Sequence, residues 1–211
     1  MAKSFLLSLI TLFLFFSAHS QSKIQFGLNG GATYTTFWGN EFARNFNHNI
    51  GFMTGIHLDY KFTPGLLFAL NLNYERRSID ASSVPFDSTG QSLFPTVTNY
   101  TYDYLNIPIM LKVPFGKQEL WFFNFGLFTN ILINDNVDQE VYGNSFKNLD
   151  IGLISGIGKA FNINDNNELA LELRTNLGLA NISDLESQFL GVEKLRTSSL
   201  NLMITYIFKN K

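Results

Sequence analysis

Few side chains in this sequence have the chemistry of catalytic acids, bases or nucleophiles. His57 is followed two residues later by Asp59, and a His–carboxylate pair of this kind can perform acid–base chemistry. Ser82, Ser83 and Ser88 are candidate nucleophiles, but they lie in a polar segment without a recognisable catalytic setting. A buried, hydrogen-bonded His is the commoner role for a residue such as His57. We therefore expect no enzymatic activity and no catalytic residues.

Two acidic groups of residues are candidates for Ca²⁺ binding, because this ion prefers carboxylate and carbonyl oxygens. The first group is Asp80, Asp87 and Asp103, and the second is the segment Asn134-Asp135-Asn136-Val137-Asp138. The segment resembles the start of an EF-hand loop, but it lacks the Gly and the terminal Glu at the required spacing. Polar loops are the favoured interpretation of both groups, so we expect no metal site and no cofactor.

Composition and charge exclude further classes of function. The chain has 211 residues with 15 Lys and Arg against 17 Asp and Glu, so no basic field is available for nucleic-acid phosphates. Zero Cys removes Fe–S clusters, thiolate zinc sites and thiol nucleophiles. The lack of a basic field excludes nucleic-acid binding. Hydrophobic residues make up 45% of the chain, and charged residues make up only 15%, against roughly a quarter in typical globular domains.

The N-terminus has the three parts of a secretory signal. Lys3 precedes an apolar run over residues 5–16, and the small and polar residues Ser17-Ala18-His19-Ser20 follow it. A transmembrane helix needs roughly 20 apolar residues, so a helical anchor is the weaker interpretation. We expect a cleaved signal peptide over residues 1–20 and a mature domain over residues 21–211 that works outside the cytoplasm.

The remainder of the chain alternates apolar and polar residues, which is the period of β-strands. From Ile50 to Tyr60 every second residue is apolar or Thr, while the residues between them are Met53 or small, charged or His. The sequence predicts eight such strands, over residues 24–35, 50–61, 66–77, 100–113, 119–131, 150–161, 168–179 and 199–208. The predicted fold class is all-β.

The connections between these strands alternate in length. Short turns over 62–65, 114–117 and 162–167 contain Pro, Gly, Asn and Asp, which favour tight turns. Polar long loops cover 36–49, 78–99, 132–149 and 180–198, so that all four lie at one end. This layout predicts an eight-stranded antiparallel up-and-down transmembrane β-barrel with short periplasmic turns and long extracellular loops.

Alternation alone does not decide which face lies inside, because a soluble lipocalin-like barrel would alternate with its apolar face inward. Aromatic residues favour lipid on the outside, since they gather near both predicted rims as in the two girdles of membrane barrels. Those near the short turns are Tyr60, Phe62, Phe115, Trp121, Phe161 and Phe208, and those near the long loops are Tyr34, Tyr74, Tyr102 and Phe128. We therefore place the protein in the outer membrane, in contact with lipid.

If the polar face is interior, the charged residues of the strands share one narrow lumen. Unpaired charges there would be costly, so we expect a network of ion pairs and hydrogen bonds that plugs the barrel and prevents conduction. The predicted lumen network comprises His57, Asp59, Lys61, Glu75, Arg77, Lys112, Glu172 and Arg174.

The segment Tyr104-Leu105-Asn106-Ile107-Pro108-Ile109-Met110-Leu111-Lys112 is similar to the "YLxIPhhhK" strand of the PorT-like outer-membrane β-barrel proteins of Bacteroidetes. The motif residues are Tyr104, Leu105, Ile107, Pro108 and Lys112. A Pro gives no N–H to a ladder, so we expect a β-bulge at Pro108. The resemblance implies an integral outer-membrane barrel, in some members part of a protein-secretion or gliding-associated apparatus, and brings no catalytic residues.

Two classes of function remain open. The first is a monomeric structural or interaction barrel that contacts other envelope proteins through loops 78–99 and 132–149, with Phe86, Leu93 and Phe94 as apolar contact residues. The alternative is a small barrel that binds lipid or another apolar ligand, either embedded in the membrane or soluble and lipocalin-like.

Overall fold

Eight long strands make up nearly all of the structure. The computed structural model describes residues 23–39, 43, 46–83, 89–91, 94, 96–135, 147–182 and 194–209. The strands are β1 (Ile24–Trp38), β2 (Phe46–Thr63), β3 (Leu66–Ser83), β4 (Thr96–Phe115), β5 (Trp121–Asp135), β6 (Leu149–Asn164), β7 (Asn167–Gly178) and β8 (Arg196–Phe208). The predicted signal peptide, residues 1–20, lies outside the described residues.

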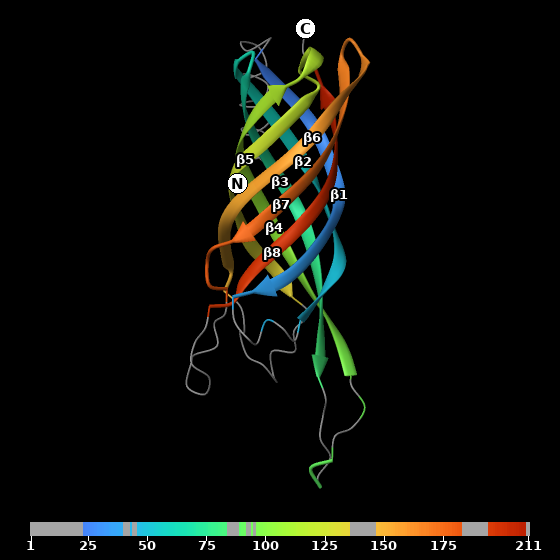
Figure 1. Ribbon diagram of the computed structural model, residues 1–211, viewed down its shortest axis with the longest axis vertical. Coiled ribbons are helices and arrows are strands. Elements are labelled where there is room, and N and C mark those ends of the chain that lie inside the picture. Colours follow the sequence, from blue (N-terminus) through green and yellow to red (C-terminus); the bar gives the residue numbers. More distant parts are fainter. Residues whose placement is uncertain are drawn as a thin grey trace, which may run out of the picture.

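The strands close into one barrel in sequence order (Figure 1). Each strand pairs antiparallel with the next, and β8 closes the ring on β1 from Phe26↔Phe208 to Trp38↔Arg196. The strands are 12 to 20 residues long, whereas crossing a bilayer takes about 9–11 residues. The predicted all-β, eight-stranded up-and-down barrel is thus confirmed.

The short turns all lie at one end, as predicted, although their bounds differ by a few residues. The turn between β4 and β5 begins after Phe115 and contains a 3₁₀ turn, η2 (Lys117–Glu119). Gly116 precedes it with φ 79°, in the left-handed region that Gly adopts without a Cβ clash. In the described residues no helix is long or apolar enough to cross a membrane.

The apolar face of the barrel points outward and the polar face points inward. On β8, for example, Asn201 is fully buried whereas its neighbour Leu202 is 51% exposed. The buried set includes Asn, Glu, Arg and Asp side chains, while Leu, Ile and Phe dominate the exposed set. A soluble lipocalin-like barrel has the opposite arrangement, so that alternative is wrong.

The aromatic girdle at the short-turn end matches the prediction, whereas at the long-loop end only Tyr34 and Tyr74 of the four predicted residues lie on the outward face. Trp121 and Phe161 point outward and are exposed, as are Phe62, Phe115 and Phe208. Tyr102 and Phe128, which the sequence placed in the outer girdle, are only 2% and 1% exposed and lie inside. Each is in phase with the inward-facing residues of its own strand. The prediction was wrong because it considered only their position near the rim.

No bulge occurs at Pro108, so that prediction was also wrong. The β3–β4 ladder keeps one register from Leu70↔Ile109 to Asn73↔Asn106 and only loses pairing between these points. The register shift of β4 against β5 lies instead at Asp103/Tyr104. Pro108 therefore removes ladder bonds without inserting an extra residue, because a missing N–H alone requires no change of register.

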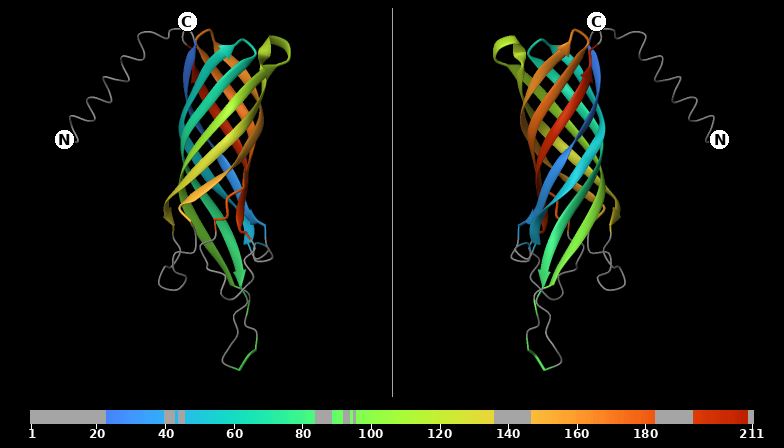
Figure 2. Two further views of the ribbon diagram at one scale, coloured as in Figure 1. Left: turned by 90° about the vertical axis from the view of Figure 1, so that its left-hand side faces the viewer. Right: turned by 90° about the vertical axis from the view of Figure 1, so that its right-hand side faces the viewer.

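The hairpin of β3 and β4 extends beyond the rest of the barrel at the long-loop end (Figure 2). Its ladder continues to Ser83↔Thr96, well past the predicted strand ends at residues 77 and 100. Part of the loop predicted over 78–99 is therefore a projecting β-ribbon.

Candidate functional site: the filled lumen

An arginine with two carboxylate partners lies in the lumen toward the long-loop end. Arg77 on β3 donates from Nε and Nη2 to the two oxygens of Glu75, at 2.7 and 3.1 Å. It also donates from Nη1 to Asp150 on β6, at 3.3 Å across the barrel. All three side chains are at most 1% exposed, and the guanidinium lies over the Tyr104 ring. The group is a fully desolvated charge cluster, held together by charge-assisted hydrogen bonds.

A chain of amide side chains connects this cluster to the centre of the lumen. Asn73 donates to Asn106 at 3.0 Å, Asn106 donates to Asn130 at 2.6 Å, and Asn130 donates to Asp150 at 3.0 Å. These residues come from β3, β4, β5 and β6, so the chain runs across four neighbouring strands. Asn106 and Asn130 each both donate and accept, which satisfies polar groups that would otherwise be costly to bury.

A second charge cluster lies nearer the short-turn end. Lys112 on β4 donates from Nζ to Asp59 on β2 at 2.7 Å, and its ammonium lies over the Phe122 ring. His57 Nε2 is 3.1 Å from the same carboxylate oxygen. With its amide nitrogen toward the imidazole, Asn71 donates to His57 Nδ1 at 2.6 Å. In this orientation Nδ1 of the imidazole accepts a hydrogen bond from Asn71, and the Nε2 side of the ring faces Asp59.

A third ion pair, between Arg174 and Glu172, is connected to the second cluster through Asn71. Arg174 on β7 donates from Nε and Nη2 to Glu172 at 3.0 and 2.8 Å, and Asn124 donates to the same carboxylate at 3.0 Å. In the orientation above, Asn71 accepts from Arg174 Nη1 at 3.1 Å. Polar side chains from β2, β3, β4, β5 and β7 thus form one connected network.

Apolar side chains fill the lumen above, between and below these clusters. The cluster at the long-loop end, here called the apolar cap, comprises Phe37, Ala43, Ile79, Tyr102, Tyr104, Ile182 and Leu195. A smaller cluster around Met110 and Phe128 lies deeper, and one around Phe122 and Ile207 lies toward the short turns. An eight-stranded barrel is just wide enough for its interior side chains to fill, and this lumen follows that rule.

The structure brings together most of the predicted lumen residues but not all of them. His57, Asp59, Glu75, Arg77, Lys112, Glu172 and Arg174 are all buried in the lumen. Lys61 is exposed and lines a hollow of about 180 Å³ at the short-turn mouth, so it does not belong to the buried network. The alternation assigned Lys61 to the correct face, but the position lies at the end of β2, beyond the enclosed part of the barrel.

Asp150 was missed, although it supplies the second carboxylate to Arg77. The signal for it was present, because Asp150 shares the alternation phase of Gly152 and Ile154 at the start of β6. The amides Asn71, Asn73, Asn106 and Asn130 were also not assigned to the network.

The motif strand contributes to the lumen directly. Tyr104, Pro108 and Lys112 occupy inward positions of β4, where Tyr104 contacts Arg77 and Lys112 pairs with Asp59. Leu105 and Ile107 occupy the alternate, outward positions and are half-buried. The motif thus contributes one aromatic ring, Tyr104, and one cation, Lys112, to the interior of the barrel.

Two of the acidic residues considered for Ca²⁺ have other partners in the structure. Asp80 accepts from Asn49 and Asn99, and Asp103 accepts a bidentate pair from Arg76. Asp87, Asn136 and Asp138 lie outside the described residues, as does Ser88. Within the described residues, no three His or acidic side chains form a group suited to a metal ion.

Several solved structures resemble this chain, all with TM-scores below 0.5. Among curated proteins, none matches the sequence. Solved structures with a similar fold include neisserial surface protein A, with 16% identity over 87% of this chain and 96% of that one and a TM-score of 0.49. OprG of Pseudomonas aeruginosa has 12% identity over 90% and 96% of the two chains, with a TM-score of 0.49. Outer Membrane Protein W of E. coli has 14% identity over 90% and 99%, with a TM-score of 0.48.

A family model, described as the outer membrane protein beta-barrel domain, matches residues 18–184, which is most of the chain. The matched segment includes strands β1 to β7 and nearly all of the polar network. The outward apolar face is what a barrel in contact with lipid requires. The chain therefore belongs to the outer membrane protein beta-barrel domain family and is a protein of the outer membrane.

Proposed function

We propose that this protein is a closed, non-conducting and non-enzymatic barrel with a structural or interaction role in the cell envelope. The observation that carries the proposal is the filled lumen, in which buried ion pairs and amides lie beneath the apolar cap. In the part of the barrel that the structure describes, a lumen filled in this way leaves no room for a water-filled path or a substrate. What is left to recognise a partner is the part of the protein outside the bilayer.

The projecting β3–β4 hairpin is the favoured contact surface. It extends beyond the other strands, and two apolar side chains near its end, Phe94 and Val97, are 91% and 62% exposed. Exposed apolar side chains outside the membrane are the kind of surface that a protein partner covers. The sequence predicts loop 132–149 at the same end of the barrel, and we include it in the proposed surface. Residues 136–146 of this loop lie outside the described residues.

The proposal includes three finer assignments. The motif from Tyr104 to Lys112 supports membership of the PorT-like group of Bacteroidetes within the wider family. The charge, apolar run and small residues of the N-terminus support a signal peptide over residues 1–20. A single chain closes the barrel without a partner strand, which supports a monomer.

Site-specific photo-crosslinking in intact cells tests the interaction role. A photoreactive residue at position 94 is expected to form an adduct with another envelope protein. The matched control is the same residue at Asp165, which is exposed in a short turn at the opposite end of the barrel. An adduct from position 94 that is absent at position 165 supports the proposal, and no adduct from position 94 contradicts it.

The alternative of a barrel that binds an apolar ligand requires space inside it. Side chains occupy the described part of the lumen from the apolar cap to the short-turn clusters, and this favours the interaction role. Lipid extraction of the purified protein, followed by mass spectrometry, distinguishes the two. An apolar ligand that stays with the barrel after the outer surface has been delipidated would favour the alternative.

A further inference from the structure

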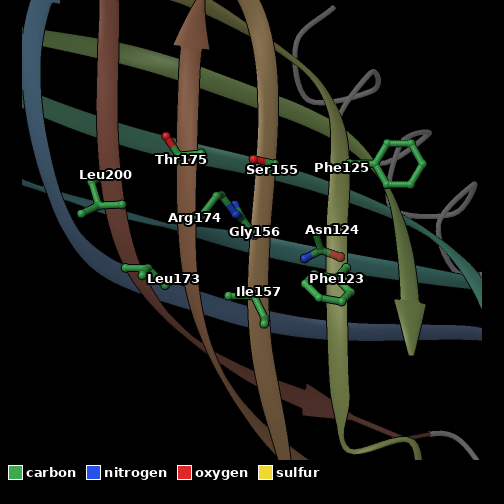
Figure 3. Close-up of a pocket in the computed structure, with 10 residues that line it drawn as sticks. All are labelled: Phe123, Asn124, Phe125, Ser155, Gly156, Ile157, Leu173, Arg174, Thr175 and Leu200. Atoms are coloured by element: carbon green, nitrogen blue, oxygen red, sulfur yellow. The ribbon is translucent and has the colours of Figure 1, made fainter. Parts of the chain in front are cut away.

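The lipid-facing surface has a hollow of about 430 Å³ over strands β5, β6, β7 and β8. Its floor is formed by Ser155 and Thr175, which lie side by side on β6 and β7 (Figure 3). Phe125 borders it on one side and Leu200 on the other. Asn124 and Arg174 also border it, although their side chains are buried in the lumen. The apolar residues around the hollow all face outward and are exposed, so it is a depression in the outer wall; they are Phe123, Phe125, Ile157, Leu173 and Leu200.

The strand register explains why the depression is there. Phe125, Ser155, Thr175 and Leu200 are paired in one row across the four strands, with two small residues between two large ones. The next row toward the short turns has Phe123, Ile157 and Leu173, which are all large and exposed. Large side chains thus border a gap that opens toward the membrane. Unfilled space would forfeit dispersion contacts, so an acyl chain fits it.

A cation lies on the same strand at the short-turn rim. Lys159 points outward from β6, and its ammonium is 5.2 Å from the ring centres of both Trp121 and Phe161. Two aromatic faces hold the ammonium by cation–π attraction at the level of the girdle. Within the described residues no carboxylate lies within ion-pair distance of Lys159, in contrast to outward-facing Arg76, which pairs with Asp103.

The distance from Lys159 to the hollow suits a single phospholipid, with its phosphate at Lys159 and an acyl chain in the hollow. Lys159 and Ser155 are four residues apart on β6, or about 13 Å along the strand. For a strand tilted by about 45°, this is roughly 9 Å of depth, within the 15 Å or so that one leaflet contributes to the hydrocarbon core. A phosphate at Lys159 therefore places an acyl chain of the same molecule over Ile157 and into the hollow.

We propose that this face binds an anionic phospholipid of the periplasmic leaflet. Lys159 contacts the phosphate, Trp121 and Phe161 flank the head group, and one acyl chain lies in the hollow at Ser155 and Thr175. Charge complementarity selects this occupant over a second copy of the chain, because the same face of a copy would bring a second Lys159 and, among the described residues that line the hollow and flank Lys159, no acid. The proposal is independent of any partner of the long loops.

Quenching of Trp121 fluorescence tests the head-group contact. The chain has two Trp, so Trp38→Phe leaves Trp121, beside Lys159, as the only Trp, and excitation at the red edge of the Trp absorption avoids the Tyr residues. The protein is reconstituted in phosphatidylcholine vesicles that contain phosphatidylglycerol, with bromine on the acyl chains of one lipid or the other. We expect about a fivefold preference for phosphatidylglycerol next to Trp121, the size expected for one basic residue near an anionic membrane surface.

Lys159→Gln should abolish the preference. The matched control is Lys117→Gln, which removes the same charge from an exposed position in the η2 turn at the same end. Heat-modifiable gel migration verifies that each variant is folded. An unchanged preference in Lys159→Gln, or an equal loss in Lys117→Gln, overturns the proposal.

A second variant tests the acyl-chain contact. Ser155→Leu fills the hollow without changing charge, and should lower the amount of phosphatidylglycerol retained in detergent by at least half, as measured by native mass spectrometry. Equal retention in this variant and the parent overturns the acyl-chain contact. If sedimentation shows a dimer that Ser155→Leu dissociates, the hollow is an interface between copies and the proposal is wrong.

Discussion

Replacing Arg77 with Met should destabilise the barrel far more than the same replacement at its neighbour Arg76. The two arginines are adjacent on β3, so they point to opposite sides of the wall. Arg77 is 1% exposed and lies between Glu75 and Asp150. Arg76 pairs with Asp103 through an equally good bidentate contact, but its side chain is 43% exposed.

The expected loss follows from what remains after the guanidinium is removed. Arg77→Met deletes three charge-assisted hydrogen bonds and leaves two carboxylates in the lumen without a cation. Thr33 remains near Glu75, and Thr197 and Asn130 still donate to Asp150. Breaking a buried ion pair by removing one partner costs about 3–5 kcal/mol, and these remaining donors place the estimate near 4 kcal/mol.

Urea unfolding of the reconstituted protein, followed by Trp fluorescence, measures this loss. With a slope of about 2 kcal/mol per molar, the midpoint should fall by about 2 M for Arg77→Met. Arg77→Lys, which keeps a charge but loses the planar fork, should lie between this variant and the wild type. Arg76→Met should shift the midpoint far less, because solvent screens the exposed pair.

A further variant separates the cost of stranded carboxylates from the loss of packing. Adding Glu75→Gln to Arg77→Met removes one of the two stranded charges, so part of the stability should return. Equal midpoints for Arg76→Met and Arg77→Met would refute the assignment of Arg77 to the lumen. No recovery in the double variant would refute the argument that unpaired charge causes the loss.

Three other outcomes follow from the filled barrel. Reconstitution in planar bilayers should give no steady channel current, and a steady current would contradict the closed lumen. Phe128→Ala should cost about 3–5 kcal/mol by urea unfolding, because the ring is buried inside, whereas a girdle position would tolerate it. Gly126→Ala should lower the folded, heat-modifiable fraction, because a Cβ there would lie 2.0 Å from the Ile109 carbonyl oxygen. Gly65→Ala is its control, since nothing lies within 4 Å, and equal folded fractions would argue against the close strand contact.

The sequence determined the strands, their number and the end at which the turns lie. Alternation has a period of two, and in a strand this period alone assigns each residue to one face or the other. Glu75 and Arg77, or Glu172 and Arg174, could therefore be placed together, because each pair is two residues apart on one strand. Strand ends were less well determined, since the ladders of β3 and β4 continue into segments too polar to be distinguished from loop.

Only the closed barrel decided which charges meet across the lumen. Arg77 and Asp150 are 73 residues apart, and Lys112 and Asp59 are 53 apart, so their pairing depends on strand tilt and register around the ring. The same closure left Lys61 at the mouth of the barrel. It also placed Ser155 and Thr175 side by side on the outer wall. A local pattern specifies a face, whereas distance across a barrel is a property of all eight strands together.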